Sequence, residues 1–269
     1  MRRKGACHEV VGQSKTLYKI NYIDIYDRTE ISNIFLGCSS LSTIDKMDTS
    51  NITNFSNAFN GCSSLIEFPN INMDNATDIS GTFIKLPFTS ITSIPYNWSN
   101  VTDMTGTFSY MPNLTTINIS GLSLPVVTTL SSCFRNNPLL TSVSLQNLNI
   151  PKCTSFYRLF RECSSLRNVD LTGISAPLLT NGIAMFEMCT SLVNGPSLPI
   201  STFTNLSWMF NECRSLTSLP TFNSVGNVVN IEEMYRNCTA LQSLDLSEWR
   251  PISLQNASYM CELLKDFGR

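Results

Sequence analysis

One aromatic position recurs through most of the chain at steps of 24 to 26 residues. It is phenylalanine in eight units, tyrosine in the ninth and, degenerately, cysteine in the tenth: Phe35, Phe59, Phe83, Phe108, Phe134, Phe160, Phe186, Phe210, Tyr235 and Cys261. A repeat of this length is typical of a solenoid, in which each unit is too small to bury its own apolar face and relies on its neighbours. The repeat therefore predicts a chain whose function lies on an extended surface.

The residues before each anchor have the spacing of a short amphipathic helix. With the anchor as position zero, apolar side chains recur at positions −7 and −4 and, in the later units, at −1. Threonine stands at −6 in seven consecutive units, and Asn, Asp, Ser or Thr at −5. Such residues cap helices by accepting hydrogen bonds from free backbone N–H groups. We therefore expect a helix of two to three turns that ends soon after each anchor.

The residues after each anchor have the pattern of a leucine-rich repeat. Positions +6 and +9 are apolar in most units, and four units add an apolar residue at +11. This L-x-x-L-x-L spacing predicts a short strand that lines one wall of the coil. The expected fold is thus α/β, a leucine-rich repeat solenoid of about nine to ten units, each a short helix plus a short strand.

The chain before the first anchor does not fit the repeat. Residues 15–27 (KTLYKINYIDIYD) are rich in aromatic and β-branched side chains, which suggests a strand or hairpin. Because the open end of a solenoid exposes apolar surface, this part is expected to cover it, with attachment to a partner as the alternative. The predicted organisation is an N-terminal cap or attachment segment over 1–30 and a solenoid over 31–269.

Several units resemble the BspA-like leucine-rich repeat surface proteins. Residues 57–65 (NAFNGCSSL), which follow DTSNITN at 48–54, match the F-x-x-C-x-S-L core and the T-S-N-V-T-x-M lead-in of that family. Residues 185–192, 209–216 and 245–249 are similar, and the resemblance covers roughly 31–264. It implies an α/β solenoid and, for bacterial members, adhesion to host proteins or other cells. Similar repeats also occur in phage proteins that face outward.

The composition argues against several classes of function. Net charge is −2 and only 14% of residues are charged, so no clustered Lys and Arg face is expected for nucleic acid. The basic run at residues 2–4 is interpreted as a solvated tail. The longest apolar runs are too short for a membrane-spanning helix, and no signal peptide is recognised at the N terminus. An extracellular-facing location, on a cell or a virion, therefore follows from the resemblance alone.

The ten cysteines favour packing rather than chemistry. Six share position +3: Cys38, Cys62, Cys163, Cys189, Cys213 and Cys238. The other units have Leu86, Met111, Asn137 and Leu264 there, and the Leu and Met residues indicate that the position requires apolar volume. Disulfides between neighbouring units are the alternative, because adjacent rungs fall within disulfide range. No metal is expected, since the chain has no Cys-x-x-Cys pair and one histidine, His8. We expect no cofactor and no catalytic site.

The candidate ligand site is the solvent-facing side of the strands. Positions +8 and +10 have small hydrogen-bonding groups and some carboxylates, suited to a glycan or an extended polypeptide: Thr43, Asp45, Glu67, Thr116, Asn118, Ser142, Ser144, Asn168, Asp170, Asn194, Ser218, Ser243 and Asp245. The alternative is that exposed strand positions simply need polar residues. Among the three tryptophans, Trp98 in a loop beside an irregular unit is the best candidate for an exposed aromatic anchor.

The sequence thus favours a non-enzymatic recognition or adhesion module. Its expected partner is a protein or carbohydrate on a cell surface, bound through the strand face. One alternative is a structural or receptor-binding virion component, such as a phage tail or fibre subunit, in contact with other virion proteins. A second alternative is an intracellular interaction scaffold.

Overall fold

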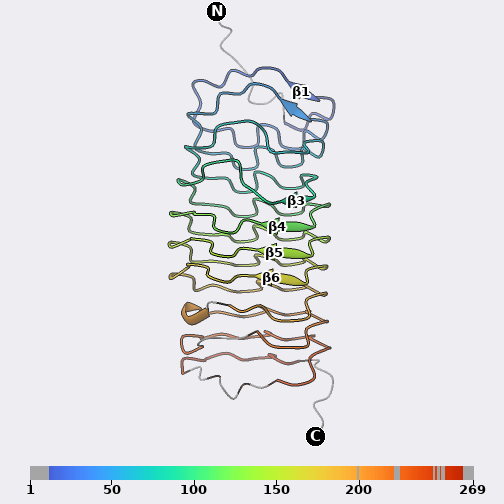
Figure 1. Ribbon diagram of the computed structural model, residues 1–269, viewed down its shortest axis with the longest axis vertical. Helices are drawn as coiled ribbons and strands as arrows, with labels where there is room; N and C mark the ends of the chain where they lie inside the picture. The colour runs from blue at the N-terminus through green and yellow to red at the C-terminus, as the bar shows by residue number, and fades with distance from the viewer. Residues whose placement is uncertain are drawn as a thin grey trace, which may run out of the picture.

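The computed structural model describes residues 12–198, 200–220, 225–244, 246, 249 and 252–262. The chain winds into a straight stack of similar coils, with the first and last described coils at opposite ends (Figure 1). Regular elements are short: β1 (Lys19–Ile20), β2 (Thr43–Ile44), β3 (Ser90–Ile91), β4 (Thr116–Asn118), β5 (Ser142–Ser144), β6 (Asn168–Asp170) and the 3-10 turn η1 (Ile200–Thr202). We number the units 1 to 10 by their anchors, from Phe35 to Cys261.

Neighbouring coils pair in parallel along more than one line. β1 pairs with β2, and β3, β4, β5 and β6 form a four-stranded sheet in chain order. A second line of parallel bridges joins the −5 positions of successive units, from Glu30 through Asn54 and onward to Asn256. The solenoid and its strand line are therefore as the repeat predicts.

The predicted helix is wrong. Residues −4 to +3 form overlapping tight turns, in which N–H groups alternate between two kinds of partner. In unit 2 the Ala58 N–H donates to the Phe55 C=O three residues back (2.9 Å), whereas the Asn57 N–H donates to the Ser80 C=O of the next coil (2.8 Å). Asn57 and Gly61 have φ of 53° and 80°. A left-handed residue every fourth position interrupts a helix, and the α part of the expected α/β class is replaced by turns.

The predicted helix caps have other partners. The Thr77 hydroxyl donates to the Thr53 C=O of the previous coil (3.2 Å), and the Thr102 hydroxyl donates to the Thr77 C=O (3.0 Å). At −5, Asp78 Oδ1 accepts from the Ser80 N–H two residues on (2.8 Å). The −5 residues thus begin a tight turn, as Asn and Asp commonly do, while the threonines join adjacent coils.

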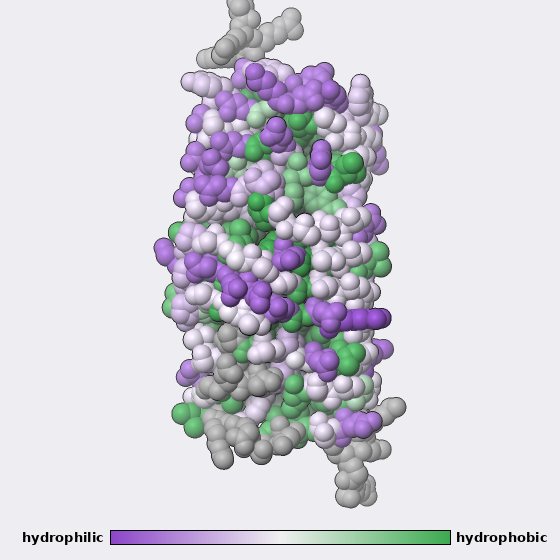
Figure 2. Space-filling view, in the orientation of Figure 1, coloured by the Kyte–Doolittle hydropathy of each residue, from purple (hydrophilic) through white to green (hydrophobic). Residues whose placement is uncertain are grey.

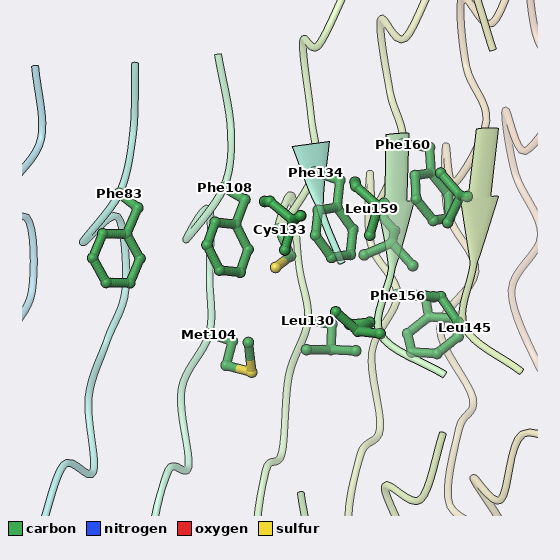
Figure 3. Packing of buried hydrophobic residues seen from close by; sticks show 14 of the residues in the cluster. Phe83, Met104, Phe108, Leu130, Cys133, Phe134, Leu145, Phe156, Leu159 and Phe160 are labelled. Carbon is green, nitrogen blue, oxygen red and sulfur yellow. The ribbon is translucent and has the colours of Figure 1, made fainter. Parts of the chain in front are cut away.

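The anchor rings stack into one continuous column through the core. Successive centroids lie 5.4 to 6.0 Å apart, with interplanar angles of 4° to 23°, from Phe35 to Tyr235. Figure 3 shows Phe83, Phe108, Phe134 and Phe160 in this row. All nine anchor rings are buried. Offset-stacked aromatic pairs are favourable beyond their buried area, so the column adds attraction between every pair of coils.

The N-terminal residues form a coil rather than a hairpin. Lys19 and Ile20 pair in parallel with Thr43 and Ile44, and Ile20 is buried in the shared core. Farther along, Ile23 bridges to Met47 of unit 1. Residues 13–23 therefore stack on unit 1, whereas Glu30, at position −5 of unit 1, bridges to Asn54 of unit 2. That the segment 1–30 caps the solenoid or attaches it to a partner stays a prediction, and residues 1–11 lie outside the described part.

The stacked column predicts a large difference between two substitutions in neighbouring parts of the solenoid. Phe160→Ala removes a fully buried ring with stacked neighbours on both sides and should lower the free energy of unfolding by about 3–5 kcal/mol. Ser142→Ala, at a partly exposed position of β5, should change it by less than about 0.5 kcal/mol. Urea unfolding of the two variants measures both values, and equal losses would contradict the stacking model.

Candidate functional site

The strand face has two parallel columns of polar side chains, held in register by backbone pairing. In β4, β5 and β6 the +8 residues Thr116, Ser142 and Asn168 are direct partners. The +10 residues at the ends of these strands pair in the same way: Asn118, Ser144 and Asp170. Ile117 and Val143 between them point into the core. Paired strands lie about 4.8 Å apart, so six predicted site residues form one regular array.

The +8 side chains in this array have no internal hydrogen-bond partner within the described chain. The neighbouring +7 threonines differ, since the Thr115 hydroxyl donates to the Thr89 C=O (2.9 Å) and the Thr141 hydroxyl to the Thr115 C=O (3.1 Å). Two adjacent columns of similar composition therefore have different roles. The +7 column joins coils, whereas the +8 column offers hydroxyl and amide groups to solvent or to a ligand.

The +10 side chains form hydrogen bonds with residues that lie just after the strands. Asn118 Oδ1 accepts from the Ser120 hydroxyl (2.8 Å), which lies 2.8 Å from the Ser144 hydroxyl. Asp170 Oδ1 accepts from the Thr172 N–H (2.9 Å), and this bond lowers the pKa of the Asp170 carboxyl below its ordinary value. Asp170 therefore remains ionised at neutral pH and gives the array one fixed negative charge.

The other predicted strand-face residues lie outside this array. Thr43 is in β2, and Asp45 forms an ion pair with Lys19 (2.7 Å). Asn194 bridges to Ser218, and its side-chain oxygen accepts from the Ser218 hydroxyl (3.0 Å). Two further predicted residues are exposed without a described strand partner, Glu67 and Ser243. Asp245 lies outside the described residues.

The prediction that Trp98 is an exposed anchor is wrong. Its side chain is 2% exposed, and its ring lies 5.9 Å from that of Tyr96 and 6.1 Å from that of Phe108. Phe68 adds an edge contact to the same cluster by way of Tyr96. The irregular unit therefore turns its aromatic residues inward, where they fill the extra space beside the anchor column. The Trp98 Nε1–H is buried without a hydrogen-bond partner.

The six +3 cysteines are buried free thiols, as the substitution pattern predicts. The Cys163 thiol donates to the Phe134 C=O of the previous coil (3.1 Å), and Cys189 does the same to Phe160 (3.2 Å). In unit 5, Asn137 stands at this position, and its amide donates to the Phe108 C=O (3.0 Å). The position thus takes a small buried donor as well as apolar volume. Burial raises the thiol pKa values, to about 12 for Cys62, Cys163 and Cys238.

A second polar surface was missed by sequence reasoning. An open groove of about 720 Å³ runs across units 2 to 6, between the −8 and −6 positions: Asn51, Thr53, Asn75, Thr77, Asn100, Thr102, Val126, Thr128 and Lys152. The Asn75 amide donates to the Ser50 C=O (2.7 Å), and the Thr77 hydroxyl is bonded to the previous coil. The sequence pattern that could have indicated this groove is the Asn-x-Thr motif, which recurs at residues 51, 75 and 100. Because the amide and hydroxyl donors of these Asn and Thr side chains are hydrogen-bonded to the previous coil, their main role is to join neighbouring coils.

Figure 2 shows one side of the coil, on which pale and purple residues predominate and green ones are scattered. Among the described residues, no group of three or more His, Cys, Asp or Glu side chains is placed to hold a metal ion. His8 lies outside the described part. None of the described segments is a helix long and apolar enough to span a membrane.

Three overlapping segments match the model of one protein family, described as "Mycoplasma protein of unknown function, DUF285". They cover residues 29–89, 77–197 and 184–269, most of the chain. The chain belongs to the DUF285 family. This match and the leucine-rich repeat structures below confirm the predicted BspA-like leucine-rich repeat family. No curated protein matches the sequence.

Solved structures extend the likeness of this DUF285 protein to leucine-rich repeat proteins. One from Eubacterium ventriosum is 19% identical with a TM-score of 0.55; the match covers 89% of this chain and 64% of that one. One from Bacteroides ovatus is 20% identical with a TM-score of 0.47, covering 91% and 76%. At these identities the likeness concerns the fold, and the chain spans less than two thirds of the first structure.

The buried thiols of the DUF285 protein predict a loss of stability at high pH. Between pH 9 and about 12 the unfolded chain loses thiol protons that the folded chain keeps, because burial raises the pKa of each thiol. The unfolded state then binds fewer protons, so the free energy of unfolding falls as pH rises. Each thiol contributes up to about 1.4 kcal/mol per pH unit. Urea unfolding under reducing conditions over this pH range measures the slope.

A variant with Cys62→Leu and Cys163→Leu is the matched control, since leucine occupies the same position at Leu86. Lysine and tyrosine titration is common to both proteins. The free energy of unfolding of the variant should therefore fall less steeply with pH, because two of the buried thiols that contribute to the slope are absent. Parallel slopes would show that these thiols do not titrate differently in the two states.

Proposed function

We propose that this chain is a non-enzymatic recognition module that binds an extended protein or glycan across its strand face. The observation that carries the proposal is the +8 column of β4, β5 and β6, where Thr116, Ser142 and Asn168 lie in register without internal hydrogen bonds. Polar side chains in the adjacent +7 column and the −6 column are bonded to the previous coil. The +8 groups are thus the ones free to bind.

The geometry favours an extended ligand that lies along the solenoid axis. The free groups repeat at one per coil, about 4.8 Å apart, and the array is a flat face rather than a closed pocket. A ligand with regularly spaced hydroxyl, amide or carbonyl groups could meet several of them at once, as a polypeptide or a polysaccharide does. Thr and Ser hydroxyls both donate and accept, and the Asn168 amide does the same. Recognition through such a face requires no catalytic group.

The location that we propose is the outer surface of a cell. This rests on the resemblance to BspA-like surface proteins, whose bacterial members adhere to host proteins or other cells. Adhesion through many modest contacts suits a long array, because several weak hydrogen bonds of about 1 kcal/mol each sum along the axis.

A triple substitution tests the strand face. Thr116→Ala, Ser142→Ala and Asn168→Ala together should lower affinity by about tenfold or more, because three available hydrogen bonds are lost. Affinity is measured on a glycan array and on immobilised extracellular-matrix polypeptides. The protein should keep its thermal unfolding profile, since these side chains make no internal hydrogen bonds.

The matched control removes three threonines of the −6 column in the same units: Thr102→Ala, Thr128→Ala and Thr154→Ala. It deletes bonds between coils and should lower stability while leaving binding unchanged. If the two triple variants bound equally well, the strand face would not be the site. If the unaltered protein bound neither the glycan array nor the immobilised polypeptides, the adhesion proposal would fail. The alternatives of a virion component or an intracellular scaffold would then be favoured.

A further inference from the structure

The coil that precedes unit 1 has an unpaired strand edge. This coil, residues 13–26, which we call the end coil, contains β1 and lies at one end of the stack (Figure 1). Among the described residues, β1 is paired on one side only, with β2. The Ile20 C=O accepts from the Asp45 N–H (2.8 Å), so the backbone groups of Ile20 face unit 1. Because alternate residues of a parallel strand bond to opposite neighbours, those of Lys19 and Asn21 face the open side.

The regular units show what such an edge binds. At position +7, the Thr115 N–H donates to the Thr89 C=O of the coil before it (2.9 Å), and at +10 the Asp45 N–H donates across one coil in the same direction. By its pairing with unit 1, the end coil has Tyr18 and Asn21 at these positions. Neither of their N–H groups has a hydrogen-bond partner among the described residues. A strand about 4.8 Å beyond β1 would supply the missing carbonyl groups.

The usual protections of a strand edge do not cover this one. Natural edges often have a proline, or a lysine whose charge opposes an added strand. Position +10 is proline in three other units: Pro69, Pro196 and Pro220. The end coil has Asn21 there instead, which keeps its N–H. The charge of Lys19 is paired with Asp45 of unit 1 (2.7 Å), which draws it away from the open side.

The end coil also has three exposed tyrosines. They are 62% to 71% exposed: Tyr18, Tyr22 and Tyr26. The next coil has small or charged residues in the same register: Ser42, Lys46 and Ser50. Folding therefore does not require aromatic rings at these positions. Side chains at +7 reach toward the preceding coil, since the Ser42 hydroxyl donates to the Tyr18 C=O (3.0 Å), and this column places the Tyr18 ring on the open side.

We infer that the end coil binds an extended segment of another polypeptide, which adds to β1 as a parallel strand. Carbonyl groups of the segment accept from the Tyr18 and Asn21 N–H groups, and its side chains contact the exposed tyrosines. The segment thus takes the place that the preceding coil has in the regular units. In strand addition, backbone bonds give affinity and side-chain contacts give specificity, and exposed tyrosines are frequent centres of binding energy. The site is separate from the strand face and does not depend on the function proposed for it.

The pairing within the solenoid favours a separate strand over a second copy of the chain. All described pairing between coils is parallel, whereas two copies related by a two-fold axis would pair their β1 strands antiparallel. Copies stacked head to tail would need a strand at the opposite end, and the described residues of units 9 and 10 contain none. An extended polypeptide supplies carbonyl groups at the spacing of this edge without either requirement.

A displayed peptide library supplies the probe. Random peptides of about eight residues, the length of one strand, are selected on the full chain, and a selected peptide is then synthesised and titrated against it. Hydrogen exchange followed by NMR should show the Tyr18 and Asn21 amides unprotected in the free protein and protected in the complex. Protection of both amides in the free protein would mean that the chain itself covers the edge, which contradicts the inference. A library that yields no binding peptide contradicts it equally.

Asn21→Pro is the matched test of the strand edge. It removes one free N–H and places a ring where the added strand would lie, so the affinity for the peptide should fall about tenfold or more. The fold should persist, as judged by thermal unfolding, because the chain has proline at this position in three other units. A normally folded variant that binds the peptide as tightly as the unaltered protein would exclude strand addition at β1.

A triple variant tests the tyrosines. Tyr18→Ser, Tyr22→Lys and Tyr26→Ser give the end coil the residues of the next coil, and they should also weaken binding about tenfold or more. Unchanged binding by this variant would remove the tyrosines from the site and contradict the inference.

Two further measurements identify the site and its occupant. The strand-face variant with alanine at residues 116, 142 and 168 should bind the peptide with unchanged affinity, and a loss of binding would move the site to the strand face. Sedimentation velocity of the full chain alone should show a monomer. Self-association that Asn21→Pro abolishes would identify a second copy as the occupant and overturn the inference.

Discussion

The way each coil divides its backbone N–H groups between two partners underlies the rest of the structure. In the turn segments, alternate groups close a tight turn within the coil, and the others bond to the next coil, as at Ala58 and Asn57. This division fixes the distance between coils and their register. The anchor rings can therefore stack at 5.4 to 6.0 Å, and the strands can pair without a shift. Hydrogen bonding and packing thus impose the same repeat distance.

The sequence predicted the repeat, the anchors, the strand line and the cysteine positions, because each depends on burial, which apolar periodicity reports directly. It did not predict the turn segments. Apolar residues at −7, −4 and 0 fit a helix, and they equally fit a chain that points every fourth side chain inward through successive turns. The distinguishing signal was Asn or Gly at −2 and +2 in the early units, as at Asn57 and Gly61. The later units lack this Asn or Gly pattern, because larger residues such as Trp208 occupy the same left-handed positions.

The sequence located the polar columns of the strand face, but it could not show which of their side chains are left without a hydrogen-bond partner in the chain. Threonine at −6, +7 and +8 has the same chemistry in all three columns. Only the position of the neighbouring coil decides whether a carbonyl lies within reach, as for Thr115, or not, as for Thr116. Trp98 shows the same limit, since its loop sequence gave no sign that Tyr96 and Phe108 enclose it. Contacts between units depend on register, which a single-unit pattern does not contain.

Stacking along one axis also has a mechanical consequence. The first and last described coils lie at opposite ends of the stack, and each coil is held by bonds to the next one (Figure 1). Tension between the ends therefore loads the joints in series, and the weakest joint yields first while the others persist. Each detached unit releases 24 to 26 residues, about 85 Å of extended chain. Such a molecule lengthens in discrete steps under load and dissipates work at every step, so a tether built from it would resist sudden pulling better than a rigid rod.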